Sequence, residues 1–213
     1  MRIGLDFDNT LAQYDHVFTA EAKLEKLVPT EWQGNKKQIR DVLLSRENGE
    51  RSWQKLQGKV YGKNMLQANL FPGVAQFLVR CKRRGNSVYI VSHKTEYGHY
   101  DPTKTPLRVS ALKWMELRGF FDETKFGLTK DCVFFEKTRE EKVYRISALK
   151  LDLYVDDLKE IFAEQHFPNI EKILFSANID EEHDEEHNAI MCKNWSAIAN
   201  KVLGPITDED CKE

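Results

Sequence analysis

The sequence predicts an α/β fold: a Rossmann-like doubly wound parallel sheet of about five to six strands with an inserted helical cap. Short apolar runs of strand length recur along the chain, and segments with helical periodicity separate most of them. Parallel strands need long crossover connections, which are usually helices, so this alternation favours a parallel sheet covered on both faces. In such a fold, functional groups lie at the carboxyl ends of the strands.

The expected strands are runs rich in Val, Ile, Leu and Phe: Ile3–Phe7, Val88–Val91, Val133–Phe135, Leu151–Val155, Ile173–Phe175 and the weaker run Ile190–Cys192. Helical patterns between them start near Val74, Leu107, Val143 and Leu158. Gly85 and Gly119 close the first two patterns. Thr138 and Glu141 form a capping box that opens the third helix.

Residues 14–70 break this alternation. The segment is polar, rich in Lys, Glu and Gln, and contains several helical patterns but no convincing strand. We therefore expect a helical cap at 14–70, inserted into a core domain that consists of residues 1–13 and 71–213.

Composition narrows the function classes. The 213 residues carry 32 basic and 34 acidic side chains, a net charge of −2, which does not suggest a nucleic-acid partner. The sequence shows no signal peptide or membrane span, so we expect no membrane partner. The four cysteines lack CxxC spacing and fit reduced thiols in a cytoplasmic protein. They are Cys81, Cys132, Cys192 and Cys211.

The first apolar run leads into Asp6-Phe7-Asp8-Asn9-Thr10, the strongest functional signal in the chain. Alternation along a strand places Asp6 and Asp8 on the same side. Two carboxylates so close together do not both ionise readily without a cation between them. The pair therefore predicts a Mg²⁺ site and a nucleophile with an acid beside it. The alternative is an acidic turn in which Asn9 and Thr10 are turn or cap residues.

Further polar groups follow at or near the ends of expected strands. Ser92 follows the second run, where a hydroxyl and the N–H groups of a turn can hold a phosphoryl oxygen. Asp156 and Asp157 follow the fourth run and could complete a hard-cation site. Lys142, early in the capped helix, or Lys137, in the loop before it, could neutralise the attacking carboxylate and the phosphate.

The order Asp-x-Asp, Ser, Lys, Asp-Asp resembles the four sequence motifs of the haloacid dehalogenase (HAD) superfamily. The phrases VYIVSHKT, GFFD, EKTREEK and YVDDL are similar to a group of bacterial and phage HAD-like hydrolases. The motifs cover the chain from Met1 to about Leu158, and residues 14–70 look like a small C1-type cap. The fourth motif departs from the GDxxxD form, which leaves open which of Asp156 and Asp157 binds the metal directly.

The resemblance implies a role for each motif residue. The catalytic set is Asp6 as nucleophile, Asp8 as general acid/base and Lys142 as the third-motif lysine, with Lys137 as the alternative. The substrate- and phosphate-binding set is Thr10, Ser92, His93 and Lys94. The metal set for Mg²⁺ is Asp6, Asp8, Asp156 and Asp157.

The implied activity is hydrolysis of a small phosphomonoester through an aspartyl phosphate. A carboxylic acid at position 8 favours phosphate-ester hydrolysis over dehalogenation, because it can protonate a leaving alkoxide and then activate water. The substrate would be a nucleoside monophosphate or a sugar phosphate, with the leaving group chosen by the cap and the loop His93–Pro106.

Two other functions fit part of the pattern. A phospho-accepting receiver domain also combines paired acids, a hydroxyl and a lysine, but its acidic pair precedes the acceptor, whereas here the pair comes late. A binding or regulatory protein that retains the site without useful turnover is the second alternative. The acidic stretch Asp180–His187 contains His183 and His187 four residues apart; we interpret it as a solvated loop rather than a Zn²⁺ site.

Overall fold

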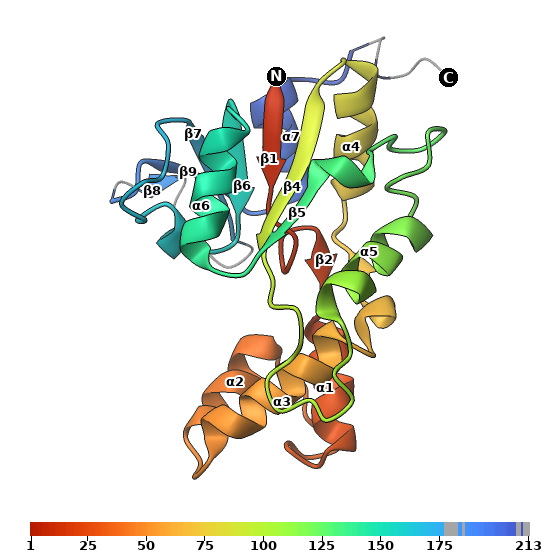
Figure 1. Ribbon diagram of the computed structural model, residues 1–213, viewed down its shortest axis with the longest axis vertical. Helices are drawn as coiled ribbons and strands as arrows, with labels where there is room; N and C mark the ends of the chain where they lie inside the picture. Colours follow the sequence, from red (N-terminus) through yellow and green to blue (C-terminus); the bar gives the residue numbers. More distant parts are fainter. Residues whose placement is uncertain (177–182, 185, 208–209, 211–213) are drawn as a thin grey trace. The chain divides into compact units, whose positions relative to one another are not determined.

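The computed structural model describes the chain except for residues 177–182, 185, 208–209 and 211–213 (Figure 1). The chain divides into two compact units. The first, the α/β unit, consists of Met1–Ala12, Leu70–His93 and Gly119–Glu213, and the second, the helical unit, of Gln13–Asn69 and Lys94–Arg118. The helical unit therefore includes residues 94–118, which the expected cap at 14–70 did not.

One seven-stranded sheet forms the centre of the α/β unit. Its strands are β1 (Arg2–Leu5), β4 (Ser87–His93), β5 (Val133–Glu136), β6 (Leu153–Asp156), β7 (Glu171–Phe175), β8 (His183–Asp184) and β9 (Ala189–Cys192), in the order β5-β4-β1-β6-β7-β9-β8. All six expected strands are present and parallel, which confirms the predicted fold class. The seventh, β8, pairs antiparallel with β9.

The central strand β1 lies between β4 and β6. Its side chains Ile3 and Leu5 are fully buried, as expected for a strand that is covered on both faces. From β1 the chain builds β4 and β5 on one side and then β6, β7 and β9 on the other. Such a reversal of strand order leaves a crevice at the carboxyl ends of the strands, where open α/β sheets bind ligands.

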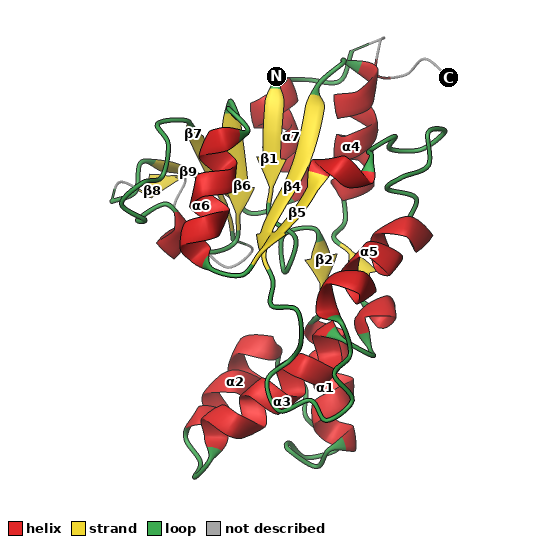
Figure 2. Cartoon of the chain, viewed as in Figure 1, coloured by secondary structure: helices red, strands yellow, loops and turns green. Residues whose placement is uncertain are grey.

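Helices cover both faces of this sheet (Figure 2). They are α4 (Val74–Arg83), α6 (Arg139–Ala148) and α7 (Trp195–Leu203), with the short 3₁₀ helices η2 (Lys130–Cys132) and η3 (Lys159–Ile161). In Figure 2, α6 lies in front of the sheet and packs on β4 and β5, whereas α7 lies behind β1 and packs on α4.

The prediction of a helix near Leu158 is wrong, because only the three residues of η3 are helical there. Leu158 is 48% exposed. An apolar face of so few residues offers too little burial to offset the cost of starting an α-helix.

The helical unit contains α1 (Asp15–Leu24), α2 (Lys36–Leu44), α3 (Gly49–Tyr61), η1 (Met65–Gln67) and α5 (Leu107–Leu117). A separate two-stranded sheet pairs β2 (Ala12–Gln13) with β3 (Asn69–Leu70). Phe18 stacks on Trp53 with ring centroids 5.2 Å apart, and Tyr61 meets Phe18 edge-on. Trp114 of α5 donates from Nε1 to the Ala68 carbonyl at 2.8 Å, one of the contacts that join residues 94–118 to this unit. Among the described residues, no helix is long and apolar enough to span a membrane.

Candidate active site

Asp6, Lys142 and Asp156 meet at the carboxyl end of the sheet. Asp6 follows β1 directly, and its backbone N–H donates to the Val155 carbonyl of β6 at 2.9 Å. Asp156 is the last residue of β6, and Lys142 comes from α6. Lys142 Nζ lies 2.6 Å from Asp6 Oδ1 and 2.6 Å from Asp156 Oδ2. All three side chains are buried, where an unpaired charge is costly. The Lys142 ammonium is the charged partner that both carboxylates share.

The start of α6 brings Lys142, rather than Lys137, to the carboxylates. The Thr138 side chain accepts from the Glu141 N–H, and the Glu141 side chain accepts from the Thr138 N–H, which confirms the predicted capping box. The helix so started directs Lys142 inward, one residue after Glu141. The Lys137 side chain lies before the helix and is exposed.

The three buried charges do not balance. Burial raises the pKa of Asp6 to about 7; Lys142 acts in the opposite direction, while the negative charges of Asp156 and Asp8 add to the increase. Burial alone would lower the pKa of Lys142, but Asp156 and Asp6 outweigh it and raise that pKa. Lys142 is therefore protonated at neutral pH, whereas the pKa of Asp6 lies close to neutral pH, where small changes in its surroundings shift its ionisation.

A third carboxylate makes this group suitable for a divalent cation. Asp6, Asp156 and Asp157 each offer an oxygen within 4.8 Å of the others. Asp156 Oδ1 also accepts from the Leu158 N–H at 2.9 Å, which holds its orientation. Three close carboxylates with one lysine leave excess negative charge, and hard oxygen ligands are those that Mg²⁺ prefers. The donor set thus fits Mg²⁺. Among the described residues, Asp8 is not part of this carboxylate group.

Thr10 lies in the loop after β1 and presents an unused hydroxyl. Its side chain is fully buried, and Oγ1 has no hydrogen-bond partner among the described residues. The Thr10 carbonyl accepts from Trp195 Nε1 at 3.0 Å. A buried hydroxyl without a protein partner is costly unless a ligand or an ordered water uses it. Trp195 was not predicted as a site residue, and its place late in the chain gave no sequence signal for this contact.

Ser92 and His93 lie at the end of β4. Ser92 is 1% exposed. His93 Nε2 lies 2.9 Å from the Lys137 carbonyl, where the ring N–H donates. Burial lowers the pKa of His93, so the ring is neutral near pH 7. His93 thus joins the end of β4 to the loop before α6, a structural contact that the sequence did not reveal.

Lys94, the last member of the predicted phosphate-binding set, belongs to the helical unit. Its side chain is 3% exposed, and Nζ lies 4.8 Å from the centroid of the Tyr61 ring. Its carbonyl accepts from Arg108 Nε at 2.9 Å. Within its own unit, Lys94 is therefore a buried cation held over an aromatic face.

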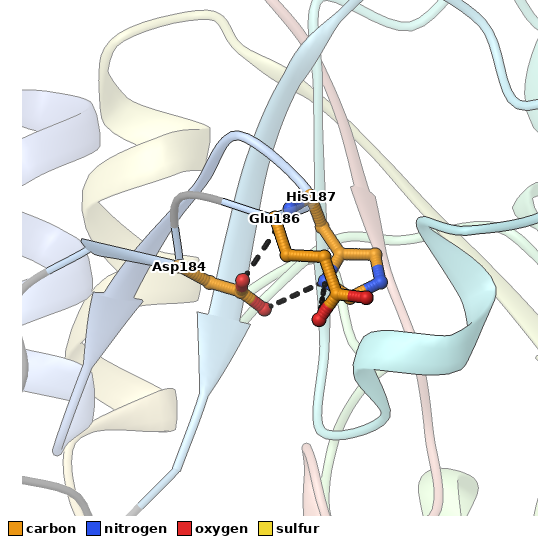
Figure 3. Close-up of side chains that lie close together, drawn as sticks. All are labelled: Asp184, Glu186 and His187. Carbon is orange, nitrogen blue, oxygen red and sulfur yellow. Dashed lines mark hydrogen bonds and ion pairs between the residues drawn. The ribbon is translucent and has the colours of Figure 1, made fainter.

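A second acidic group, at the edge of the sheet, contains Asp184, Glu186 and His187 (Figure 3). His187 Nδ1 lies 2.9 Å from Asp184 Oδ2, and the His187 N–H donates to Asp184 Oδ1 at 3.3 Å. Both side chains are mostly buried, with 10% and 13% of their surface exposed, so they are not the solvated loop residues that we expected. These contacts close the turn between β8 and β9. Residues 180–182 and 185 of the predicted acidic stretch lie outside the described residues, as does Cys211.

Two curated bacterial proteins are similar in sequence. One from Oceanobacillus iheyensis is 24% identical over 162 residues, 74% of this chain and 77% of its own length. One from Bacillus cereus is 25% identical over 162 residues, 74% of this chain and 76% of its own length. Both carry the name "Putative nucleotidase". No family model matches the sequence.

Solved structures with the same fold cover nearly the whole chain. A haloacid dehalogenase-like hydrolase from Streptococcus pneumoniae gives a TM-score of 0.59 at 14% identity, covering 94% of this chain and 97% of its own. A HAD-superfamily hydrolase from Geobacter sulfurreducens gives 0.58 at 12% identity, covering 96% of each chain. CbbY from Rhodobacter sphaeroides, solved in complex with phosphate, gives 0.50 at 14% identity, covering 92% and 95%. The chain therefore has the fold of the haloacid dehalogenase superfamily of hydrolases, which confirms the resemblance predicted from its motifs.

Proposed function

We propose that this protein is a Mg²⁺-dependent phosphomonoester hydrolase that forms an aspartyl phosphate on Asp6. One observation carries the proposal: a buried ammonium, Lys142 Nζ, lies 2.6 Å from both Asp6 and Asp156, beside a third carboxylate. A phosphoryl group brings more negative charge to such a place and needs positive charge to balance it. Mg²⁺ held by Asp6, Asp156 and Asp157 would supply that charge when bound.

The chain's own residues account for both halves of the reaction. Asp6 Oδ attacks phosphorus, and the bond from phosphorus to the leaving oxygen breaks while Asp8 gives that oxygen a proton. Asp8, now ionised, then takes a proton from water, which attacks the aspartyl phosphate and releases inorganic phosphate and free Asp6. Ser92 and the unpartnered hydroxyl of Thr10 would hold phosphoryl oxygens.

Lys142 would keep Asp6 in its attacking form. Because burial raises the pKa of Asp6, the nucleophile needs nearby positive charge to remain ionised at neutral pH. The Asp6–Lys142 contact supplies part of this charge, and it also fixes the orientation of the carboxylate.

We propose a small phosphorylated metabolite as the substrate, either a nucleoside monophosphate or a sugar phosphate. The name shared by the two similar bacterial proteins supports the nucleotide. We further propose that the helical unit acts as the cap that selects the leaving group. Its cation Lys94 and the partly exposed ring of Tyr61, whose centroid lies 4.8 Å from Lys94 Nζ, are groups that can bind an anionic or flat ligand.

A phosphate-release screen tests the proposal. Nucleoside monophosphates, sugar phosphates, a phosphopeptide and a 5′-phosphorylated oligonucleotide would be compared at equal concentration, with Mg²⁺ and after exhaustive chelation. We expect release from a small metabolite with Mg²⁺ and none without it. Full activity after chelation would contradict the metal requirement, and a macromolecule as the better substrate would contradict the proposed cap. No release from any compound would favour a binding protein.

A further inference from the structure

The side chain of Tyr154 spans the central strand of the sheet. Tyr154 lies on β6, opposite Gly4 of β1, and is fully buried. Its hydroxyl donates to the Val91 carbonyl on β4, the strand on the other side of β1. The ring therefore crosses above Gly4, and the three central strands are joined by one side chain as well as by their backbone hydrogen bonds.

Gly4 makes this crossing possible. A Cβ atom built at Gly4 would lie 2.6 Å from Tyr154 Cδ2 and 2.4 Å from Leu151 Cδ1, closer than packed carbon atoms approach one another. Glycine in a strand interior weakens the strand, and it often marks a close approach by another group. Here that group includes the ring of Tyr154.

The ring and the hydroxyl of Tyr154 each contact a group on which the proposed reaction depends. Lys142 Nζ, which bonds to Asp6 and Asp156, lies 5.5 Å from the centroid of the Tyr154 ring, within the range of a cation–π contact. The carbonyl that accepts from the hydroxyl belongs to Val91, and the same peptide group carries the N–H of Ser92. One rigid side chain thus touches the lysine and the strand end that carries the phosphate-binding hydroxyl.

We propose that Tyr154 is a positioning residue for this site. Its hydroxyl, bonded to the Val91 carbonyl, fixes the carboxyl end of β4 and hence the position in which Ser92 binds a phosphoryl oxygen. Its ring makes a cation–π contact with the Lys142 ammonium and keeps that ammonium directed at Asp6. This inference rests on the proposed function, because it assigns Tyr154 a role only through Ser92 and Lys142.

Two substitutions separate the hydroxyl from the ring. Tyr154→Phe removes only the hydroxyl, so we expect KM and the inhibition constant of inorganic phosphate to rise about two- to tenfold, the loss typical of one hydrogen bond, with kcat within about twofold. Tyr154→Leu also removes the aromatic ring that contacts the Lys142 ammonium, so kcat should fall about tenfold or more below that of Tyr154→Phe. The phenylalanine variant therefore rescues kcat but not phosphate binding.

Tyr89 provides a matched control in the same sheet. It lies on β4, and the guanidinium of Arg2 sits 4.6 Å from its ring centroid, so it too is a tyrosine with a cation over its face. It stands three residues before Ser92 and, like Tyr154, opposite Gly4, but the cation over its ring is Arg2 and not Lys142. Tyr89→Phe and Tyr89→Leu should lower the melting temperature at most, leaving KM, kcat and phosphate inhibition unchanged.

Phosphate binding with Mg²⁺, measured by titration calorimetry on the same five proteins, gives a readout that does not need turnover. An active wild type whose Tyr154→Phe variant keeps its KM and phosphate affinity would overturn the positioning role alone. Equal kinetic losses in the Tyr89 and Tyr154 variants would also overturn it, since general destabilisation would then explain them. A wild type that neither hydrolyses any phosphomonoester nor binds phosphate would overturn the proposed function and this inference together. If Tyr154→Leu fails to fold, the nearly isosteric Tyr154→Phe decides alone.

Discussion

Two acidic groups lie on the same sheet of the α/β unit, and they are built in different ways. Asp6, Asp156 and Asp157 lie at the carboxyl ends of two neighbouring parallel strands, β1 and β6, that are far apart in the sequence. Asp184, Glu186 and His187 come from a single hairpin at the sheet edge. In each group the possible ligand atoms lie within 4.8 Å of one another, so proximity alone does not distinguish them.

Their charge states do distinguish them. Burial raises the pKa of Asp6 to about 7, despite the lysine beside it. Burial also acts to raise the pKa of Asp184, but the hydrogen bonds from His187 outweigh it and lower that pKa. A lowered pKa marks a carboxylate that its own neighbours already satisfy, whereas a raised one marks a carboxylate that still needs positive charge. The comparison teaches that two acidic groups of similar spacing differ in whether their own neighbours satisfy the carboxylates, and this difference is why we propose the buried group at the strand ends as the site.

The largest effect should come from Asp6→Asn. An amide is a poor nucleophile and a weak metal ligand, so we expect phosphate release to fall by roughly 10³-fold or more. The measurement is phosphate release by purified protein, with circular dichroism as the control for folding. A folded Asp6→Asn protein with more than a few per cent of wild-type activity would show that Asp6 is not the nucleophile.

Asp8→Asn should have the next largest effect. Loss of general acid–base assistance typically slows a reaction by about 10²–10⁴-fold. Mg²⁺ binding should persist, because Asp8 is not part of the described carboxylate group. Rapid-quench trapping would measure formation and decay of the aspartyl phosphate. Unchanged rate constants for both steps would contradict the assigned role.

The pH dependence of the free energy of unfolding tests whether the pKa of Asp6 is raised in the folded protein. Between the ordinary pKa of 3.8 and about 7, Asp6 keeps its proton in the folded protein but loses it in the unfolded chain. The folded state then binds more protons, so the contribution of Asp6 to the free energy of unfolding decreases as pH rises through this range. Mg²⁺ favours the ionised carboxylate, so it should stabilise the protein more at pH 7 than at pH 5.

Melting temperatures at several pH values, with and without Mg²⁺, check this prediction. Asp6→Asn is the control, because it cannot titrate at this position and should lose the part of the pH dependence that Asp6 supplies. If wild type and Asp6→Asn respond identically to pH and Mg²⁺, Asp6 neither titrates near 7 nor binds the metal.

The smallest effect should come from His187→Ala at the edge of the sheet. It removes the Nδ1 contact to Asp184, so we expect a loss of about 0.5–1.5 kcal/mol in the free energy of unfolding. Phosphate release and its Mg²⁺ requirement should stay within about twofold of wild type. Denaturant unfolding and the phosphate assay together make the test. A large loss of metal-dependent activity would reverse the distinction between the two acidic groups.

Local patterns in the sequence were sufficient to predict most of the fold. Apolar runs located six strands, and the Thr138–Glu141 capping box located the start of α6, because both signals depend on residues close together in the chain. The same reasoning failed at Leu158, where a short apolar face predicted a helix and the chain forms only η3. It also missed the association of residues 94–118 with the helical unit, which depends on contacts such as that of Trp114 with Ala68.

The amino-acid sequence by itself therefore determined which residue types stand at the ends of which strands, and hence the kind of chemistry to expect. Only the tertiary structure decided that Lys142 rather than Lys137 meets Asp6, that Asp157 joins the carboxylate group, and that Tyr154 reaches across Gly4 to β4. The physical reason is that periodicity and capping are local, whereas these contacts form only when parallel strands pair and their carboxyl ends meet. Which side chains then touch depends on strand order, register and the space left by neighbours such as Gly4.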